Sequence, residues 1–151
     1  MLREQLKTAL KDAMLAKDQR AVATVRLINA ALKDRDIAAR EKGNLDGIDE
    51  EEILSMLATM VKQRQESIRL YEEGGRCELA TQEQEEIDII RRFMPSQLEG
   101  AELELTIDST IKEIGASDLK DMGRIMSTLK QRYPGRMDFS KASGLVRQQL
   151  V

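Results

Sequence analysis

Apolar side chains recur every three or four residues along almost the whole of this 151-residue chain, and strict apolar/polar alternation is nowhere sustained. The first spacing places apolar side chains on one face of an α-helix, whereas strict alternation is the pattern of a half-buried β-strand. The length suits one domain or two small ones. The sequence therefore predicts an all-α protein.

Four helices are predicted before residue 96, because start and stop signals separate four apolar stripes. The first stripe consists of Leu2, Leu6, Leu10 and Met14. The expected start signals of the next three helices are Asp18, the capping box of Asp49 with Glu52, and the capping box of Thr81 with Gln84. Gly74 and Gly75 are expected to end the third helix, and Pro95 the fourth.

The sequence loosens from Ser96 to Gly100, and three shorter helical patterns follow. Gly115 is expected to end the first of them, Ser117 or Asp118 to begin the second, and Ser140 to cap the last. We therefore predict a four-helix N-terminal subdomain over residues 1–95. A small three-helix C-terminal subdomain is predicted over residues 98–151.

The composition removes several kinds of chemistry. The chain has no histidine and no tryptophan, and Cys77 is its only cysteine. A nucleophile would therefore lack the usual imidazole base, and no disulfide can form within the chain. The acidic run 49–52 suits a helix start, and no interleaved Asp loop or phosphate-binding loop is present. We predict no catalytic residues, no metal site and no cofactor.

Location is predicted from the absence of a long apolar segment. No apolar run approaches the roughly 20 residues that span a bilayer. The first twelve residues, MLREQLKTALKD, carry charges too early and too often for a signal peptide. The expectation is a cytoplasmic protein that does not contact membranes.

Charge is unevenly distributed, although the net charge is only −3. Residues 1–40 carry a net charge of +4 and residues 41–100 a net charge of −8, whereas the segment from Lys120 onward carries +5. Basic side chains near the C-terminus suit phosphate contacts. The candidate RNA-binding residues are Arg132, Arg136, Lys141 and Arg147.

The second helix has a polar face that could bind a partner. Five side chains lie within about 80° of one another on a helical projection; they are Arg26, Asn29, Lys33, Asp36 and Arg40. A solvated or ion-paired surface is one interpretation. The other is an interaction face for protein or RNA, with Arg26, Asn29, Lys33 and Arg40 as its candidates.

Several collinear segments resemble the GatB/YqeY family in its stand-alone form, and together they cover essentially the whole chain. The segments are VRLINAALKDRDI at 25–37, VKQRQESIRLYEEGGRCELATQEQEE at 61–86, FMPSQL at 93–98, DMGRIM at 121–126, GRMD at 135–138 and KASGLVRQQL at 141–150. In the glutamine-dependent aspartyl/glutamyl-tRNA amidotransferase, the matching domain is the helical tail of the GatB component, which helps to hold the tRNA.

The resemblance implies an all-α protein of two subdomains that engages tRNA or the translation apparatus. Nothing in the chain resembles the catalytic cradle or the amidase of the larger enzyme, so the implied role is non-catalytic. The family-level label of carbon–nitrogen ligase activity with glutamine as amido-N-donor would come from that larger enzyme and not from chemistry in this chain.

Three functions remain open at this point. The first is a tRNA-binding accessory module that uses the C-terminal basic residues. The second is a protein-interaction adaptor that uses the helix face from Arg26 to Arg40, or the acidic middle of the chain, with a partner in translation. The third and weakest is a small ligase or amidotransferase.

Overall fold

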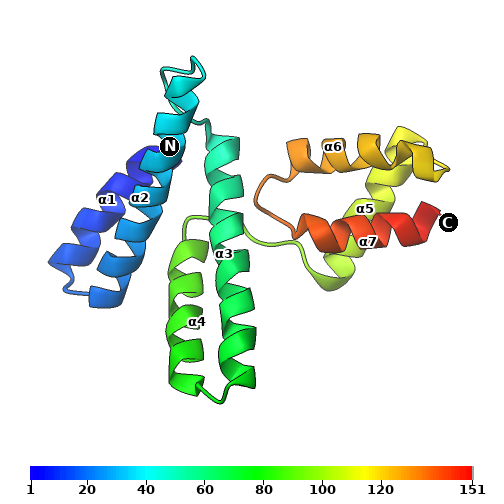
Figure 1. Cartoon of the computed structure of the whole chain (residues 1–151). Helices are drawn as coiled ribbons and strands as arrows, with labels where there is room; N and C mark the ends of the chain where they lie inside the picture. The colour runs from blue at the N-terminus through cyan, green and yellow to red at the C-terminus, as the bar shows by residue number, and fades with distance from the viewer. Residues whose placement is uncertain (151) are drawn as a thin grey trace. The chain divides into compact units, whose positions relative to one another are not determined.

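The computed structural model describes residues 1–150, and it contains seven α-helices, one short 3₁₀ helix and no strand within that range (Figure 1). The all-α prediction is confirmed. The chain divides into two compact units, 1–95 and 96–151. The helices are α1 (Leu2–Leu15), α2 (Gln19–Glu41), α3 (Glu50–Glu73), α4 (Cys77–Arg91), α5 (Gly100–Ile114), η1 (Leu119–Asp121), α6 (Met122–Arg132) and α7 (Phe139–Leu150).

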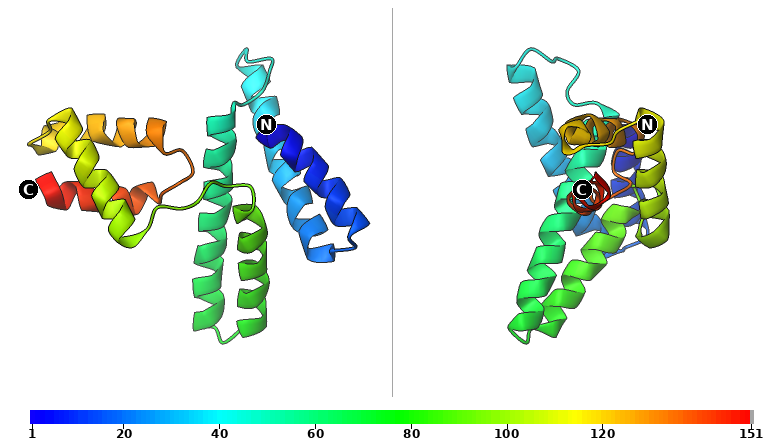
Figure 2. Two further views of the ribbon diagram at one scale, coloured as in Figure 1. Left: turned by 180° about the vertical axis from the view of Figure 1, so that it is seen from behind. Right: turned by 90° about the vertical axis from the view of Figure 1, so that its right-hand side faces the viewer.

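The N-terminal unit consists of two antiparallel helical hairpins, α1–α2 and α3–α4 (Figures 1 and 2). The amide of Asp18 donates to the carbonyl of Ala13, and that of Lys17 to Met14, which closes α1 as a Schellman motif. Lys17 has φ of +56° at the position where glycine is usual. The α3–α4 turn uses a glycine instead, Gly75, with φ of +72°.

Both hairpins contribute to a common apolar core. The apolar faces of α1 to α4 meet in a buried cluster that also takes in Ile48 from the α2–α3 connection. Leu6, Ile28, Leu57 and Ile90 are fully buried in it. Burial of such side chains contributes about 1.5–3 kcal/mol each, so this cluster holds the two hairpins together. Met14, which the sequence placed on the apolar stripe of the first helix, is 53% exposed.

Three predicted helix starts are confirmed and two are wrong. Asp118 accepts a hydrogen bond from the amide of Lys120 and caps η1, as the sequence predicts. Asp18 and Asp49 accept hydrogen bonds from the amides of Ala21 and Glu52 and so cap α2 and α3. Thr81 lies inside α4, where its hydroxyl donates to the carbonyl of Cys77.

In the C-terminal unit, Ser140 lies within α7, and the cap is Asp138. The Asp138 carboxylate accepts from the amides of Ser140 and Lys141.

Asp36 of α2 connects three parts of the N-terminal unit. Its carboxylate accepts from both terminal nitrogens of Arg3, at 2.5 and 3.1 Å, and from the amide of Ile48 at 2.9 Å. Arg3 Nη2 also donates to the carbonyl of Ile48 at 2.8 Å. The carboxylate thereby fixes α1 and the α2–α3 loop to the C-terminal half of α2. Gly47, with φ of +83°, passes directly beside it.

The C-terminal unit is a three-helix bundle. The apolar sides of α5, α6 and α7 meet around Ile107, Ile125, Leu129 and Val146, which are fully buried. Gly115, with φ of +74°, ends α5 as the sequence predicts.

Residues 96–98 are part of the C-terminal unit rather than a loose connection. The amide of Leu98 donates to the carbonyl of Arg136, and the Gln97 side chain donates to the carbonyl of Gly135. Leu98 is buried with the core of the bundle. The unit thus begins at Ser96, two residues before the predicted boundary at 98. Independent folding of the two subdomains stays a prediction.

The Gly47→Ala substitution is expected to destabilise the N-terminal unit by about 2–4 kcal/mol. A Cβ atom there would lie 2.3 Å from Asp36 Oδ1. The cost combines a left-handed backbone strain of about 1–2 kcal/mol with disturbance of the buried hydrogen bonds of Asp36. Gly75→Ala is the control, because a Cβ atom there meets nothing within 4 Å and only the backbone strain remains. Equal losses in urea unfolding would contradict the role given to Asp36.

The Asp36–Arg3 pair is expected to produce an acid-sensitive component of stability. The hydrogen bonds and charge of Arg3 lower the pKa of Asp36, while burial opposes that shift. Its contribution is therefore fully present above the unfolded pKa of about 3.9 and is lost as pH falls through the lower folded pKa.

The test is to measure unfolding from pH 2 to 7 in Asp36→Asn. This variant should lose about 1.5–3 kcal/mol at neutral pH, the range for hydrogen bonds to a charged group, and show a flatter acid branch. The exposed neighbour on the same helix provides the control, Asp34→Asn. Identical acid branches in Asp36→Asn and the unsubstituted protein would contradict the assignment.

Candidate functional site

The C-terminal basic residues lie on α6, on α7 and on the turn that joins them. Arg132, the last residue of α6, makes a bidentate ion pair with Glu113 of α5, with distances of 2.5 and 3.2 Å. Both side chains are exposed. The hydrogen bond and charge of each partner lower the pKa of Glu113 and raise that of Arg132. Arg132, a candidate for phosphate contacts, is therefore already ion-paired within the C-terminal unit.

Arg136 is held by the turn itself. Its Nε donates to the carbonyl of Ser96 at 3.1 Å, and its guanidinium lies 5.9 Å from the centre of the Tyr133 ring. Arg132 and Arg136 therefore both make contacts within the fold. Their partners are 19 and 40 residues away in the sequence, beyond the reach of a local pattern.

Lys141 and Arg147 are the candidates whose side chains take part in no ion pair or hydrogen bond within residues 1–150. Both lie on α7 and are exposed, and no ion pair joins either to a residue within 1–150. On a helical projection they lie on the side opposite the buried Ala142 and Val146. Gly144 lies between them on that exposed side, where a Cβ atom would meet nothing within 4 Å. No side chain therefore projects from α7 between the two charges.

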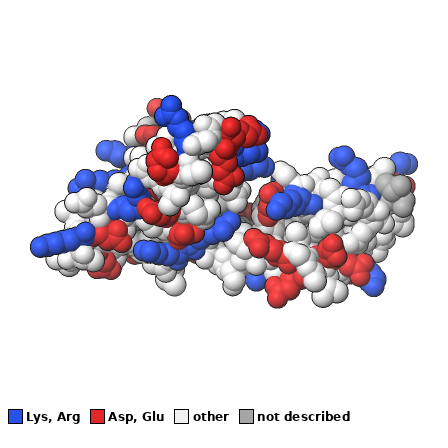
Figure 3. Space-filling view, turned by 90° about the horizontal axis from the view of Figure 1, so that it is seen from below, with Lys and Arg blue, Asp and Glu red and all other residues white. Residues whose placement is uncertain are grey.

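Lys130 adds a further positive charge near the start of α7. Its Nζ lies 6.0 Å from the centre of the Phe139 ring, and Phe139 itself packs against the bundle core. Acidic and basic side chains are interspersed on the face of the molecule shown in Figure 3. The positive charge of α7 is thus a local feature on a surface of mixed sign.

The polar face of α2 divides into two parts. Arg26, Lys33 and Arg40 are exposed, and Asn29 is half-buried. Asp36 is buried in its pair with Arg3. The three cations and Asn29 therefore remain candidates for an interaction face, whereas Asp36 has a structural role. The local sequence around Asp36 does not indicate this role, because its partner Arg3 is 33 residues away.

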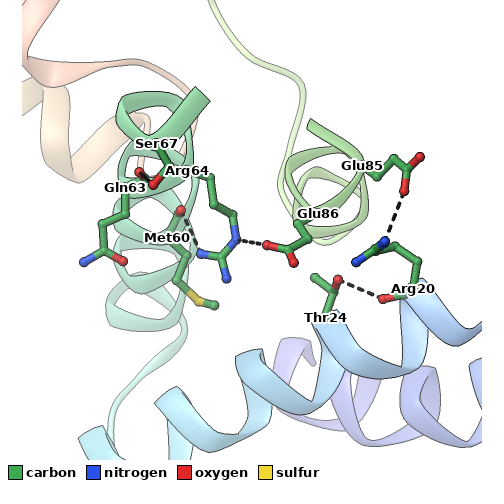
Figure 4. Close-up of polar contacts among 8 residues, drawn as sticks. All are labelled: Arg20, Thr24, Met60, Gln63, Arg64, Ser67, Glu85 and Glu86. Atoms are coloured by element: carbon green, nitrogen blue, oxygen red, sulfur yellow. Dashed lines mark hydrogen bonds and ion pairs between the residues drawn. The ribbon is translucent and has the colours of Figure 1, made fainter. Parts of the chain in front are cut away.

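A second polar cluster lies where α4 meets α2 and α3 (Figure 4). Arg64 donates to Glu86 at 2.9 Å and to the carbonyl of Met60 at 3.1 Å, and Arg20 donates to Glu85 at 3.2 Å. Burial and the nearby Glu86 carboxylate raise the pKa of Glu83, and the positive charge of Arg64 partly opposes this rise. Arg64 of α3 and Glu86 of α4 are both largely buried and already paired with each other. The cluster therefore connects helices and is not a free binding site.

Reactive and metal-binding side chains are sparse in the described part of the chain. Cys77 is exposed at the first residue of α4. Within residues 1–150, no three potential metal-ligating side chains of histidine, cysteine or acidic type come together. None of the helices described is long and apolar enough to cross a membrane.

These features define a small all-α protein of two helical units, with exposed cations on the outer side of its last helix. The chain belongs to the YqeY-like protein family, whose family model matches residues 3–150. The family resemblance inferred from the sequence segments is thereby confirmed.

Relatives named "Altered inheritance of mitochondria protein 41, mitochondrial" occur in several yeasts. The one from Saccharomyces cerevisiae is 33% identical over 109 residues, which cover 72% of this chain and 56% of the relative. The one from Eremothecium gossypii is 36% identical over 89 residues, covering 59% and 46%. The one from Lachancea thermotolerans is 29% identical over 116 residues, covering 75% and 59%. The matched part thus spans about half the length of these relatives.

The names of the relatives correct one prediction. The sequence was expected to belong to a cytoplasmic protein, yet the similar yeast proteins are named as mitochondrial. The cytoplasmic assignment is therefore wrong. It rested on the charged N-terminus and the lack of an apolar segment, and neither property distinguishes cytoplasm from the inside of an organelle.

Removal of the Glu113 carboxylate is expected to release Arg132 for binding to anions. Glu113→Gln should strengthen binding to a polyanion such as heparin and shift elution from a heparin column to higher salt. The thermal midpoint should stay unchanged, because the pair is exposed. Asp108→Asn is the control, since it removes one acidic charge from the same helix and releases Lys112 instead. Equal shifts in both variants would show a net-charge effect and contradict a specific release of Arg132.

Proposed function

We propose that this protein is a non-catalytic accessory module that binds tRNA or another structured RNA through the phosphate backbone. The observation that carries the proposal is the outer side of α7, where Lys141 and Arg147 are exposed and unpaired within the described chain. Lysine and arginine side chains neutralise phosphates and release counterions without reading the base sequence. Membership of the YqeY-like family and the resemblance to the tail of the amidotransferase component support this assignment.

The aromatic residues favour a structured RNA over a single strand. Single-strand binding uses exposed aromatic rings on which bases stack. In the C-terminal unit, Tyr133 and Phe139 both pack against the bundle core, and each ring also lies near a cation. Because these rings already contact the bundle core and a cation, they are not free to stack on bases. Contacts to the RNA phosphate backbone are then the expected mode of binding. A folded RNA presents phosphates at fixed spacing and suits a rigid helix.

Charge distribution sets the expected strength of binding. The basic residues of the C-terminal unit belong to a chain whose net charge is −3 and whose residues 41–100 carry a net charge of −8. Acidic side chains repel RNA at distances up to the Debye length, about 8 Å at physiological salt. Binding should therefore be weak at physiological salt and increase steeply as the salt concentration falls.

The double variant Lys141→Ala/Arg147→Ala tests the α7 contacts. Binding of fluorescently labelled tRNA to the full chain is measured by anisotropy between about 25 and 200 mM salt, the range over which phosphate contacts change affinity steeply. Each lost phosphate contact should flatten the slope of log affinity against log salt by about 0.7–0.9. The double variant should thus lose about 1.4–1.8 from the slope and weaken binding to all tRNAs alike.

The matched control removes two positive charges from the N-terminal unit. Lys7 and Lys11 of α1 are exposed and take part in no ion pair among residues 1–150, so Lys7→Ala/Lys11→Ala changes the net charge equally. The proposal requires this control to keep the original slope. An unchanged slope in the α7 variant, or an equal loss in both, would contradict the proposed site. A nuclease-treated pull-down would then show whether the associated molecule is protein.

A further inference from the structure

The outward side of α2 carries apolar residues that no helix of its own unit covers. Leu27 is 49% exposed and Ile37 is 44% exposed, and Ala23 and Ala30 are exposed as well. Together with Asp34 and Glu41, these residues are spaced alternately by four and three positions. That spacing is the a/d seam of a heptad repeat, in which 27, 34 and 41 are a positions and 23, 30 and 37 are d positions.

The opposite side of the same helix already forms the core of the N-terminal unit. Val25, Ile28 and Leu32 are buried there against the neighbouring helices. The α2 seam, defined as residues 23, 27, 30, 34, 37 and 41, lies on the other side of the helix; four of its residues are apolar, and Asp34 and Glu41 are acidic. It extends over about 27 Å at 1.5 Å per residue, long enough for a partner helix of about five turns.

One edge of the α2 seam is lined by cations. Arg26, Lys33 and Arg40 occupy successive g positions, all three are exposed, and no ion pair involves them within residues 1–150. At the other edge, Thr24 is fully buried and Ala31 packs against the core. Only one edge of the α2 seam is therefore charged, and its cations are exposed for contact with a partner. In a helix pair, charges at the g positions select the partner and its orientation.

We propose that the α2 seam docks an amphipathic helix of another protein whose flanking positions are acidic. The apolar seam provides the contact area, and the row formed by Arg26, Lys33 and Arg40 selects glutamate or aspartate on the partner. Asp34, at a central a position, selects a lysine or arginine on the partner seam, and such a polar contact fixes register. This surface lies in the N-terminal unit and is independent of the RNA contacts proposed for α7.

Charge argues against a second copy of this chain as the occupant. In an antiparallel pair of α2 helices the g positions of the two copies face each other, so three cations would meet three cations. In a parallel pair the g positions face e positions, which are Thr24, Ala31 and Ala38 and carry no charge. Neither arrangement satisfies the basic row. An RNA would satisfy the cations but would leave Leu27 and Ile37 uncovered.

The test uses the full chain and two synthetic peptides of about 21 residues, or three heptads, as probes. Both peptides carry leucine at a and d, with one lysine at the central a position. The first has glutamate at e and g, and the second has lysine at e and g. Binding is measured by fluorescence anisotropy at low and high salt. The glutamate-flanked peptide should bind at least about tenfold more tightly than the lysine-flanked peptide, and the difference should shrink in high salt.

Charge reversal on α2 provides the decisive comparison. Arg26→Glu/Lys33→Glu/Arg40→Glu should reverse the preference between the two peptides. Leu27→Glu/Ile37→Glu should weaken both peptides about tenfold or more, while thermal unfolding stays close to that of the unsubstituted protein because both residues are exposed. The control Lys7→Glu/Lys11→Glu/Lys141→Glu changes net charge equally and should keep the original preference.

Several outcomes would overturn the proposal. Failure of the glutamate-flanked peptide to bind, or equal affinity for both peptides, would contradict an acidic helix as the occupant. Dimerisation at micromolar concentration that is lost in Leu27→Glu/Ile37→Glu would assign the α2 seam to a second copy. Loss of tRNA binding in the charge-reversal variant, with no effect on the peptides, would assign the basic row to RNA. The Lys141→Ala/Arg147→Ala variant should retain peptide binding, which separates this test from that of the RNA proposal.

Discussion

The buried carboxylate of Asp36 is the constraint on which the N-terminal unit depends. It accepts hydrogen bonds from the guanidinium of Arg3 and from the amide of Ile48, and so it connects α1, α2 and the loop that leads into α3. A buried carboxylate is costly unless it is paired and hydrogen-bonded, and each of these partners offsets part of that cost. The same carboxylate excludes a side chain at Gly47. The Asp36 carboxylate therefore fixes the path of the α2–α3 connection at Gly47 and Ile48.

The position of Asp36 also decides which side of α2 faces outward. The ion pair with Arg3 connects the C-terminal half of α2 to α1 on one side. The buried Ile28 and Leu32 pack the helix against the core. The remaining side carries Leu27, Ile37 and the basic row. A surface helix normally buries one apolar stripe and exposes a polar one, and the exposed Leu27 and Ile37 depart from that pattern. Packing within the N-terminal unit covers one face of α2, and the proposed partner helix would cover the α2 seam.

Local signals predicted most of the helices. The errors come from local signals that have two possible uses and, at the candidate site, from non-local contacts. Asp18 and Asp49 were recognised as caps because their partners lie three residues away. Thr81 was misread because a threonine hydroxyl can cap a helix or donate to the carbonyl four residues earlier, and the sequence does not distinguish these uses. For the candidate site, composition and spacing identified the cations. They could not identify Glu113 and Ser96, whose pairing with Arg132 and Arg136 depends on tertiary packing.

The two proposed surfaces differ in how they would respond to their surroundings, and this difference bears on what an accessory module can do. Contacts from Lys141 and Arg147 to phosphates depend on counterion release and weaken steeply with salt. Contacts at the α2 seam combine buried apolar area with charge, so part of their strength persists in high salt. If one partner complex presented both an acidic helix and an RNA, the second contact would become intramolecular. Two weak contacts on one chain would then bind far more tightly together than either does alone.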